Sequence, residues 1–196
     1  MPKRILEDEG TILSILEKTP VGVLATCAGE EPWAVPMNFV YDAGSRRVYL
    51  HSGLKGRKLE NIRANPRVSF LVYVPGKLAA AGKACEFGQR YQSVILSGRA
   101  RIVGANEEKR RALEQLVAKY AGGRKVEPPA DEDLARVAVI AIEVERVSGK
   151  ENVAPELLSE EDPIWKLTGA GNSGFKDVAA KHDHYLAEGE VQRWRE

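Results

Sequence analysis

Strand-like segments that follow one another in hairpin order constrain the fold of this chain more than any other feature. They are rich in β-branched and aromatic residues, and short turns of Gly, Asp and Ser separate several of them. A parallel α/β fold would instead alternate strands and helices regularly. We therefore predict a mainly β fold of the α+β type, an antiparallel barrel of six or seven strands with helices packed outside it. The predicted strands are Val21–Thr26, Pro32–Tyr41, Arg47–Leu50, Val68–Val74, Tyr91–Val103, which bends or divides at Gly98, and Val137–Val144.

Three segments have the periodicity or the boundary residues of helices. The first has a stripe of isoleucine and leucine, and Pro20 ends it because proline disfavours a helical conformation in the residue before it. Pro66 ends the second segment in the same way, and Gly122 ends the third. Two stretches without clear periodicity, Pro75–Gln89 and Gly122–Asp133, are predicted to be connections. The predicted helices are Glu7–Lys18, Lys58–Arg63 and a helix of roughly four turns that begins at Asn106.

The length of the chain and a change of character near its C-terminus predict two parts. A chain of 196 residues is long enough for one domain with a hydrophobic core and an appendage. Residues 1–152 contain all the predicted strands and are expected to form a barrel domain. Residues 153–196 carry scattered aromatic residues and one predicted helix, Lys176–Leu186. Because such a tail seldom folds alone, we expect this C-terminal extension to pack on the barrel or on a second subunit.

Composition and charge argue against several classes of protein. The formal net charge is +1, so no overall electric field would attract nucleic acid or an anionic membrane. No stretch approaches the roughly 20 apolar residues of a membrane span, and no apolar signal core follows the N-terminus, so we expect a cytoplasmic protein. The sequence shows no Ser-His-Asp pattern, paired-carboxylate motif or Walker loop, which leaves hydrolysis and nucleoside-triphosphate chemistry without support.

The spacing of cysteine and histidine predicts no metal site. Cys27 and Cys85 match no zinc or redox spacing and are predicted to be reduced, mostly buried thiols. His182 and His184 lie two positions apart in the predicted C-terminal helix, so their imidazoles diverge by roughly 200° and cannot converge on one ion.

The segment from His51 to Lys58 carries the clearest chemical signal. It runs from a predicted strand through a glycine-containing turn into a predicted helix, so free backbone N–H groups and the positive end of the helix dipole meet there. Three cations crowd that positive end, where they oppose the dipole, and a bound phosphate would resolve the conflict. We therefore predict an anion site here, and the alternative is a solvated basic loop. The residues that would form the site are Ser52, Lys55, Gly56, Arg57 and Lys58.

Pro36 lies inside the predicted strand Pro32–Tyr41. Because proline cannot donate a hydrogen bond to a neighbouring strand, this strand is predicted to lie at a sheet edge or to contain a bulge. Open backbone groups beside Pro36, Met37 and Asn38 could face a ligand. The alternative is an ordinary protected edge.

Several motifs, in this order and spacing, resemble one family. They are similar to the FMN-binding split β-barrel proteins related to pyridoxamine 5′-phosphate oxidase, and most of all to the nitroimidazole-resistance branch of that group. The resemblance extends from about Val21 to Asn152. The motifs that carry it are Pro36–Tyr41, His51–Lys58, Asn65–Val68, Arg90–Val94 with Gly98–Ala100, and Ser148–Lys150.

The resemblance implies a split β-barrel homodimer that binds FMN at its subunit interface. Arg57 and Lys58 would hold the flavin phosphate, with His51 and Ser52 beside it. The backbone of Pro36–Asn38 would lie along the flavin ring. This agrees with the anion site expected from the helix start alone.

Ser93 marks a departure from the oxidases of this group, which often carry a flavin-contacting glutamine there in a Gln-Val-Arg sequence. The chain has Ser-Val-Ile instead, which argues against oxidation of pyridoxamine phosphate itself. Ser93 and Ser52 offer hydroxyl groups that fit phosphate or ribityl contacts, although either could equally cap a turn.

The predicted function is an FMN-dependent oxidoreductase that reduces small nitroaromatic or related acceptors at the dimer interface. His51 could deliver a proton, because its intrinsic pKa lies near neutrality, or could serve only as a structural hydrogen bonder. One alternative is a flavin or haem protein for storage or sensing, with His51 as the first haem-ligand candidate. Another is a dimeric scaffold with a vacant pocket.

Overall fold

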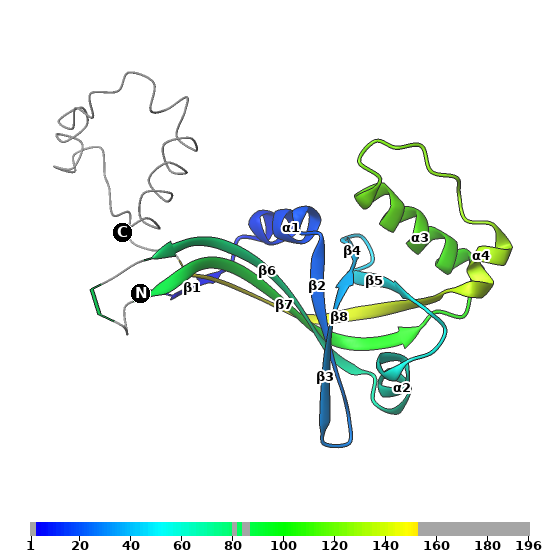
Figure 1. Ribbon diagram of the computed structural model, residues 1–196, viewed down its shortest axis with the longest axis horizontal. Helices are drawn as coiled ribbons and strands as arrows, with labels where there is room; N and C mark the ends of the chain where they lie inside the picture. The colour runs from blue at the N-terminus through cyan, green and yellow to red at the C-terminus, as the bar shows by residue number, and fades with distance from the viewer. Residues whose placement is uncertain (1–2, 80–81, 84–86, 153–196) are drawn as a thin grey trace, which may run out of the picture. The chain divides into compact units, whose positions relative to one another are not determined.

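One antiparallel sheet of eight strands forms the frame of the described chain (Figure 1). The computed structural model describes residues 3–79, 82–83 and 87–152. The strands lie in the order β3-β2-β6-β7-β8-β5-β4, and β1 pairs with the end of β8. They are β1 (Lys3–Leu6), β2 (Val21–Ala28), β3 (Glu31–Asn38), β4 (Val40–Asp42), β5 (Arg47–Ser52), β6 (Arg67–Ala79), β7 (Gly88–Ile102) and β8 (Ala138–Asn152).

The main core lies on one face of this sheet, the inner face. Leu24, Phe70 and Leu96 lie directly opposite one another on β2, β6 and β7, and all three are fully buried. Side chains of a strand alternate between faces, so these positions define the buried set. Two helices add apolar residues to the same core: α1 (Glu9–Lys18) contributes Ile15 and Leu16, and α2 (Arg57–Ala64) contributes Leu59 and Ile62.

Among the described residues, those that cover the opposite face, the outer face, lie at one end of it. There α3 (Asn106–Tyr120) packs over β5 and β8, and Ala112 forms a second small core with Tyr49 and Val139. Away from α3, Ile95 and Tyr73 are 40% and 41% exposed. The predicted fold, a mainly β antiparallel barrel with packed helices, is confirmed as a sheet that curls into a half-barrel (Figure 1).

The bend predicted at Gly98 is confirmed. The pairing of β7 with β8 shifts its register between Ser97 and Gly98. A side chain at position 98 would place its Cβ 1.9 Å from the carbonyl oxygen of Glu143. Glycine is therefore required for this close approach of two backbones.

The edge position predicted for Pro36 is also confirmed, because β3 is the last strand on its side of the sheet. The predicted strand Pro32–Tyr41 is nevertheless two strands. Phe39 interrupts it between β3 and β4, which pairs with β5 instead. Phe39 turns into the inner core, where it is fully buried.

Several predicted boundaries were wrong. Pro75–Gln89 is not simply a connection, since β6 continues to Ala79 and β7 begins at Gly88. Leu78 and Phe87 are exposed, so no alternation of buried and exposed positions marked these strand ends. Strand β1 was missed because it has only four residues.

The helix α4 (Asp131–Arg136) was missed as well, at the end of the connection predicted over Gly122–Asp133. Leu134 is its only buried residue, so it lacks an apolar stripe. The carboxylate of Asp133 accepts a hydrogen bond from the Ala130 N–H at 2.9 Å and stabilises its start.

The expectations for residues 153–196, His182 and His184 included, lie outside the described residues, as does Cys85. Cys27 carries a free thiol that is half-buried rather than buried, and its Sγ donates to the carbonyl of Gly29 at 3.3 Å. No group of three His, Cys, Asp or Glu side chains within 3–79, 82–83 and 87–152 could hold a metal ion. In the same ranges, no helix is both long and apolar enough to cross a membrane.

Candidate functional site

The start of α2 follows β5 through a glycine-containing turn, as the sequence predicted. Gly56 caps the helix with a φ of 131°, a backbone conformation that favours glycine. Its carbonyl accepts hydrogen bonds from the N–H groups of Leu59 at 2.9 Å and Glu60 at 3.3 Å. No side chain of the described residues caps this start. The first backbone N–H groups of α2 therefore remain available to an anion.

The position of α2 is fixed by hydrogen bonds to β2. The buried amide of Asn61 donates to the Thr26 hydroxyl at 3.0 Å, and the amide of Asn65 donates to the Cys27 carbonyl at 3.1 Å. These bonds and the buried Leu59 orient the helix from both of its ends. A site at the start of α2 is thus carried by a rigid element rather than by a loop alone.

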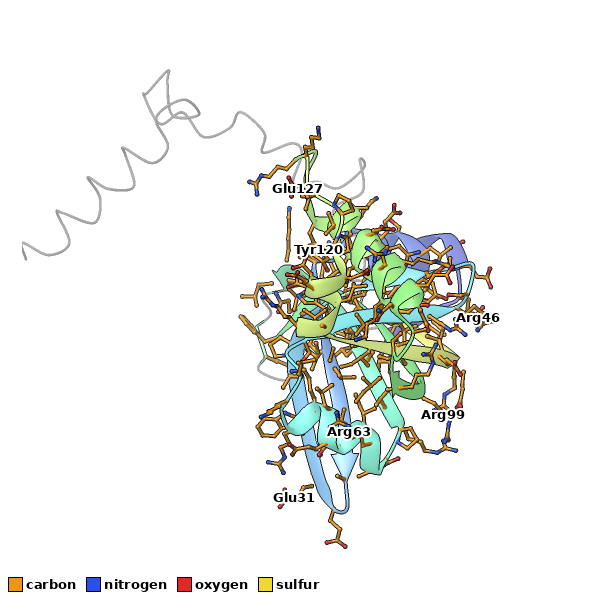
Figure 2. The ribbon with its side chains drawn as sticks, turned by 90° about the vertical axis from the view of Figure 1, so that its right-hand side faces the viewer. Glu31, Arg46, Arg63, Arg99, Tyr120 and Glu127 are labelled. Atoms are coloured by element: carbon orange, nitrogen blue, oxygen red, sulfur yellow. The ribbon has the colours of Figure 1, made fainter. Side chains whose placement is uncertain are left out.

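The three cations at this start are not equivalent. Arg57 forms an ion pair with Glu31 at the tip of the β2–β3 hairpin, and its guanidinium lies 4.6 Å from the ring centre of Trp33. Lys55 is exposed and Lys58 is half-buried, and neither forms an ion pair within the described part of the chain. Figure 2 shows Glu31 and the α2 residue Arg63 at the same end of the barrel domain. The sequence prediction missed Glu31 and Trp33, which lie 26 and 24 positions before Arg57 and became neighbours only through the hairpin.

The residues Pro36, Met37 and Asn38 divide between the two faces of β3. Met37 packs against the inner core. Pro36 lies on the outer face, in register with Val23 on β2 and, across the sheet, with Leu71. This row of side chains on the outer face continues to the neighbouring strands and comprises Pro36, Val23, Leu71, Ile95 and Ser148. It is mainly apolar and lies away from α3.

His51 and Ser93 lie far apart in a single chain. His51 is in register with Val139 on β8, and Ser93 is in register with Lys150, eleven residues further along that strand. At about 3.3 Å per residue, the two positions are separated by up to roughly 36 Å. One copy of the chain does not bring these two predicted site residues together.

The hydroxyl groups of the two predicted serines already have partners. Ser52 is 9% exposed and donates to the carbonyl of Gly53 at 3.0 Å, within the turn that leads to α2. Ser93 is 8% exposed and donates to the carbonyl of Lys150 at 3.3 Å. The imidazole of His51 is exposed and makes no hydrogen bond within the described residues.

Behind β5, an ionic network holds α3 on the outer face. Arg101 donates to the carboxylate of Glu108 at 2.6 Å, and the Tyr49 hydroxyl donates to the same carboxylate at 3.1 Å. The hydrogen bond from Arg101 is the largest of the effects that lower the pKa of Glu108, so the carboxylate stays ionised at neutral pH. This network has a structural role next to Tyr49, two residues before His51.

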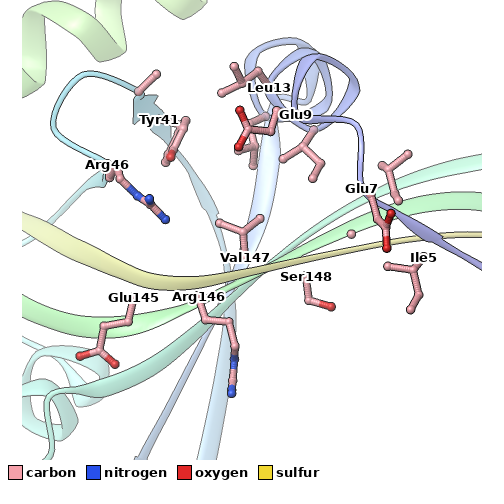
Figure 3. A pocket seen from close by; sticks show the side chains of 15 residues that line it. Ile5, Glu7, Glu9, Leu13, Tyr41, Arg46, Glu145, Arg146, Val147 and Ser148 are labelled. Atoms are coloured by element: carbon pink, nitrogen blue, oxygen red, sulfur yellow. The ribbon is translucent and has the colours of Figure 1, made fainter.

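Two hollows lie away from the start of α2 and from β3. One of about 690 Å³ opens between α1, β1 and β8, and Tyr41 and Arg46 face it (Figure 3). Another of about 680 Å³ lies beside it and is lined by Val40 and Lys119. No predicted cofactor residue lines either hollow. The candidate site is therefore the start of α2 together with the open outer face of β3.

The comparison with family models decides the relationship. The model described as pyridoxamine 5′-phosphate oxidase matches residues 8–151. The chain belongs to this family. The resemblance read from the sequence is thereby confirmed, with a match that also includes α1. A search of curated proteins found no significant match.

Solved structures of similar proteins agree with this assignment. A candidate 5-nitroimidazole antibiotic resistance protein of Bacteroides thetaiotaomicron is 27% identical with a TM-score of 0.66, over 76% of this chain and 87% of that one. The flavocytochrome Anf3 of Azotobacter vinelandii is 25% identical with a TM-score of 0.68, over 83% and 75%. An FAD-binding protein of Mesorhizobium loti is 27% identical with a TM-score of 0.57, over 78% of this chain and all of its own.

Proposed function

We propose that this protein binds FMN between two copies of the chain and uses it to reduce a small acceptor, such as a nitroaromatic compound. The observation that carries the proposal is the start of α2. Its uncapped N–H groups fit a phosphate group, which needs several donors and positive charge, and so do Lys55 and Lys58, which form no ion pair within the described residues. Relatives that by their names bind FAD, act as a flavocytochrome or resist nitroimidazoles support a flavin.

A homodimer is proposed because no helix of the described residues covers the outer face of β3, β2, β6 and β7. Leu71 is half-buried, while Ile95 and Tyr73 are more exposed, and together they give this face an apolar strip. The residues of Val68–Val74 are largely apolar on both faces of the strand, which also favours a partner on this face. A second copy seated there would also bring another chain toward Pro36 and Asn38. The C-terminal extension, residues 153–196, is proposed to add to this packing.

The proposed roles of the residues follow from their places in the fold. Lys58, Lys55 and the N–H groups after Gly56 would hold the phosphate, and Ser52 would order the turn through its bond to Gly53. Arg57 would join them only by leaving Glu31, an exposed ion pair of low strength. The backbone of Pro36–Asn38, with Ser93, would orient the ring. When bound, FMN supplies the transfer of electrons to the acceptor.

His51 is the proposed proton donor. Its exposed imidazole makes no hydrogen bond within the described residues, and histidine is the side chain most often used for general acid catalysis. The same free imidazole favours a second candidate function, a flavin or haem protein without catalysis, in which His51 would be a haem ligand. The similarity to a flavocytochrome supports that candidate.

The test is the absorbance spectrum of the purified protein before and after FMN is added and excess ligand removed by desalting. Retained flavin bands support the proposal, and a Soret band that the His51→Ala variant loses would support the haem candidate. A colourless protein whose melting temperature is unchanged by FMN would contradict both.

Variants of α2 make the test specific to the phosphate site. Lys58→Ala should weaken FMN binding by about 10–100-fold, the effect of one charge-assisted hydrogen bond. Arg57→Ala should have a smaller effect because Arg57 is already paired with Glu31. Arg63→Ala is the matched control, an exposed cation in the last turn of the same helix, and should not change the affinity. For the reaction, chemically reduced FMN-bound protein should be reoxidised faster when a nitroimidazole is added without oxygen.

A further inference from the structure

The hydroxyl of Tyr120, the last residue of α3, lies at the junction between β3 and β4. It accepts a hydrogen bond from the N–H of Phe39 at 2.8 Å. It also lies 2.7 Å from the carbonyl oxygen of Pro20 and 2.8 Å from that of Phe39. A hydroxyl has one proton, so it donates to one of these carbonyls at a time. One side chain thus joins α3, the end of α1 and the strand junction.

The junction needs such a partner. Pairing of β3 with β2 ends at Asn38, and pairing of β4 with β5 begins at Val40, so Phe39 has no strand partner for its backbone. Its side chain is fully buried and packs edge to face on Phe70, with ring centres 5.0 Å apart. Backbone groups at such a position are costly to leave unpaired. The Tyr120 hydroxyl accepts from the Phe39 N–H and can donate to the Phe39 carbonyl.

The same contact reaches the end of β3. The side-chain amide of Asn38 donates to the carbonyl of Pro20 at 3.2 Å, the same oxygen that faces the Tyr120 hydroxyl. Asn38 and Tyr120 therefore meet at one carbonyl group. Tyr120 lies well away from Glu31 and Arg63 of the phosphate end (Figure 2).

Lys119 strengthens the end of α3 without touching Asn38. Its amine donates to the carbonyl of Leu16 in α1 at 2.8 Å and lies 3.6 Å from the ring centre of Phe39. Burial lowers the pKa of Lys119 to about 8, while attraction to Glu17 acts in the opposite direction. Lys119 thus contacts Phe39 as Tyr120 does, but through the ring of Phe39, and it makes no hydrogen bond to the Pro20 carbonyl that Tyr120 shares with Asn38.

We propose that Tyr120 is a positioning residue for the flavin ring, because its hydroxyl sets the peptide groups at the Asn38 end of β3. This inference rests on the proposed function and deepens it. None of the expected cofactor contacts lies on α3, whereas several lie on β3. The inference means that α3 nevertheless fixes the position of β3.

The experiment compares three variants of the full chain that each remove one contact. Tyr120→Phe removes only the hydroxyl. Tyr49→Phe is the matched control, since that hydroxyl donates to Glu108 near the start of α3, at the opposite end of the helix from Tyr120. Lys119→Met is the second control, because it loosens the helix end from α1 without a contact to Asn38. For each, FMN affinity, the visible bands of the bound flavin and the melting temperature are measured.

We expect Tyr120→Phe to bind FMN about tenfold more weakly, the effect of one lost hydrogen bond, and to shift the visible flavin bands. Tyr49→Phe and Lys119→Met should leave both unchanged, even where they lower the melting temperature. If wild-type protein binds FMN and Tyr120→Phe changes only the melting temperature, Tyr120 is structural and the inference is overturned while the proposed function stands. Wild-type protein that retains no FMN would overturn both.

Discussion

The helices α1 and α2 begin in opposite ways. The start of α1 is satisfied from within the chain: the Asp8 carboxylate accepts from the Thr11 N–H at 2.7 Å and from the Thr11 hydroxyl at 2.6 Å, and Glu9 follows in the first turn. The start of α2 has Gly56 in place of a capping side chain, and the cations Arg57 and Lys58 precede the acidic Glu60 in its first turn. Acidic residues near a helix start stabilise it, whereas cations there oppose the dipole.

The residues at the start of α2 are therefore not those that would maximise the stability of the helix. Its position is secured further along by Leu59, Asn61 and Asn65 instead. A helix held in this way can leave its first N–H groups open for a ligand. The variants below test this difference between the two helix starts.

The largest effect is expected from Lys58→Glu, which gives α2 the charge pattern of α1. FMN affinity should fall more than about 100-fold, because a favourable bond is lost and a like charge faces the phosphate. The free energy of unfolding without FMN should instead rise by about 0.3–1 kcal/mol, because the new carboxylate favours the dipole. Calorimetric titration and thermal unfolding measure the two. If both quantities moved in the same direction, the contrast between the helices would be lost.

Next comes Asn61→Ala, which removes the buried anchor of α2 to Thr26. The free energy of unfolding should fall by about 1–3 kcal/mol, since the amide donates to the buried Thr26 hydroxyl. FMN affinity should fall too, because the helix start would no longer be held in place. Urea unfolding and FMN titration check these results. Asn106→Ala, an exposed change at the start of α3, serves as control.

Removal of the Asp8 cap of α1 should change the stability of the protein in a pH-dependent way and leave its FMN affinity unchanged. The hydrogen bonds from Thr11, its hydroxyl first, lower the pKa of Asp8 below 3.8, so the folded state favours the ionised carboxylate. The stability it contributes is present above pH 3.8 and is lost as the pH falls through the folded pKa. The melting temperatures of wild type and Asp8→Ala should therefore differ at pH 6 and converge in strong acid. A difference that is independent of pH would exclude this account.

The smallest effect is expected from Trp33→Ala. The stacking of Arg57 on an exposed aromatic ring is worth about 0.5–1 kcal/mol, so stability should change little. The guanidinium of Arg57 would still be paired with Glu31, so FMN affinity should stay nearly unchanged. Fluorescence titration of FMN measures the change, and a marked loss of affinity would instead indicate that Trp33 contacts the ligand.

Local signals in the sequence were enough to predict a large part of the fold and the part of the candidate site at the start of α2. The turn through Gly56 into α2, the bend at Gly98 and the edge position of Pro36 each depend on the conformational limits of one residue type, and the structure has all three. The family was also evident from the order of motifs, and the match over residues 8–151 confirmed it. Such signals survive without tertiary context because they act over a few residues.

Other features required the tertiary structure. The tyrosine at 120 and the lysine before it look like ordinary helix residues in sequence, and nothing local links Tyr120 to Phe39, 81 positions earlier. The exposed ends of β6 and β7 gave no pattern because neither face is fully buried there. The pairing of Arg57 with Glu31 was equally hidden, since the hairpin must form before these charges can meet.

The sequence alone was sufficient to predict the family, the strand-turn-helix segment at residues 47–63 and the positive charge at its helix start. The folded structure was needed to show that Arg57 pairs with Glu31, which side chains of β3 lie on the outer face, and that α3 reaches the end of that strand through Tyr120. The reason is the distance along the chain over which each kind of interaction acts. Backbone preferences and helix dipoles act between near neighbours in the chain, whereas ion pairs, open faces and hydrogen bonds between distant segments exist only after the sheet has folded.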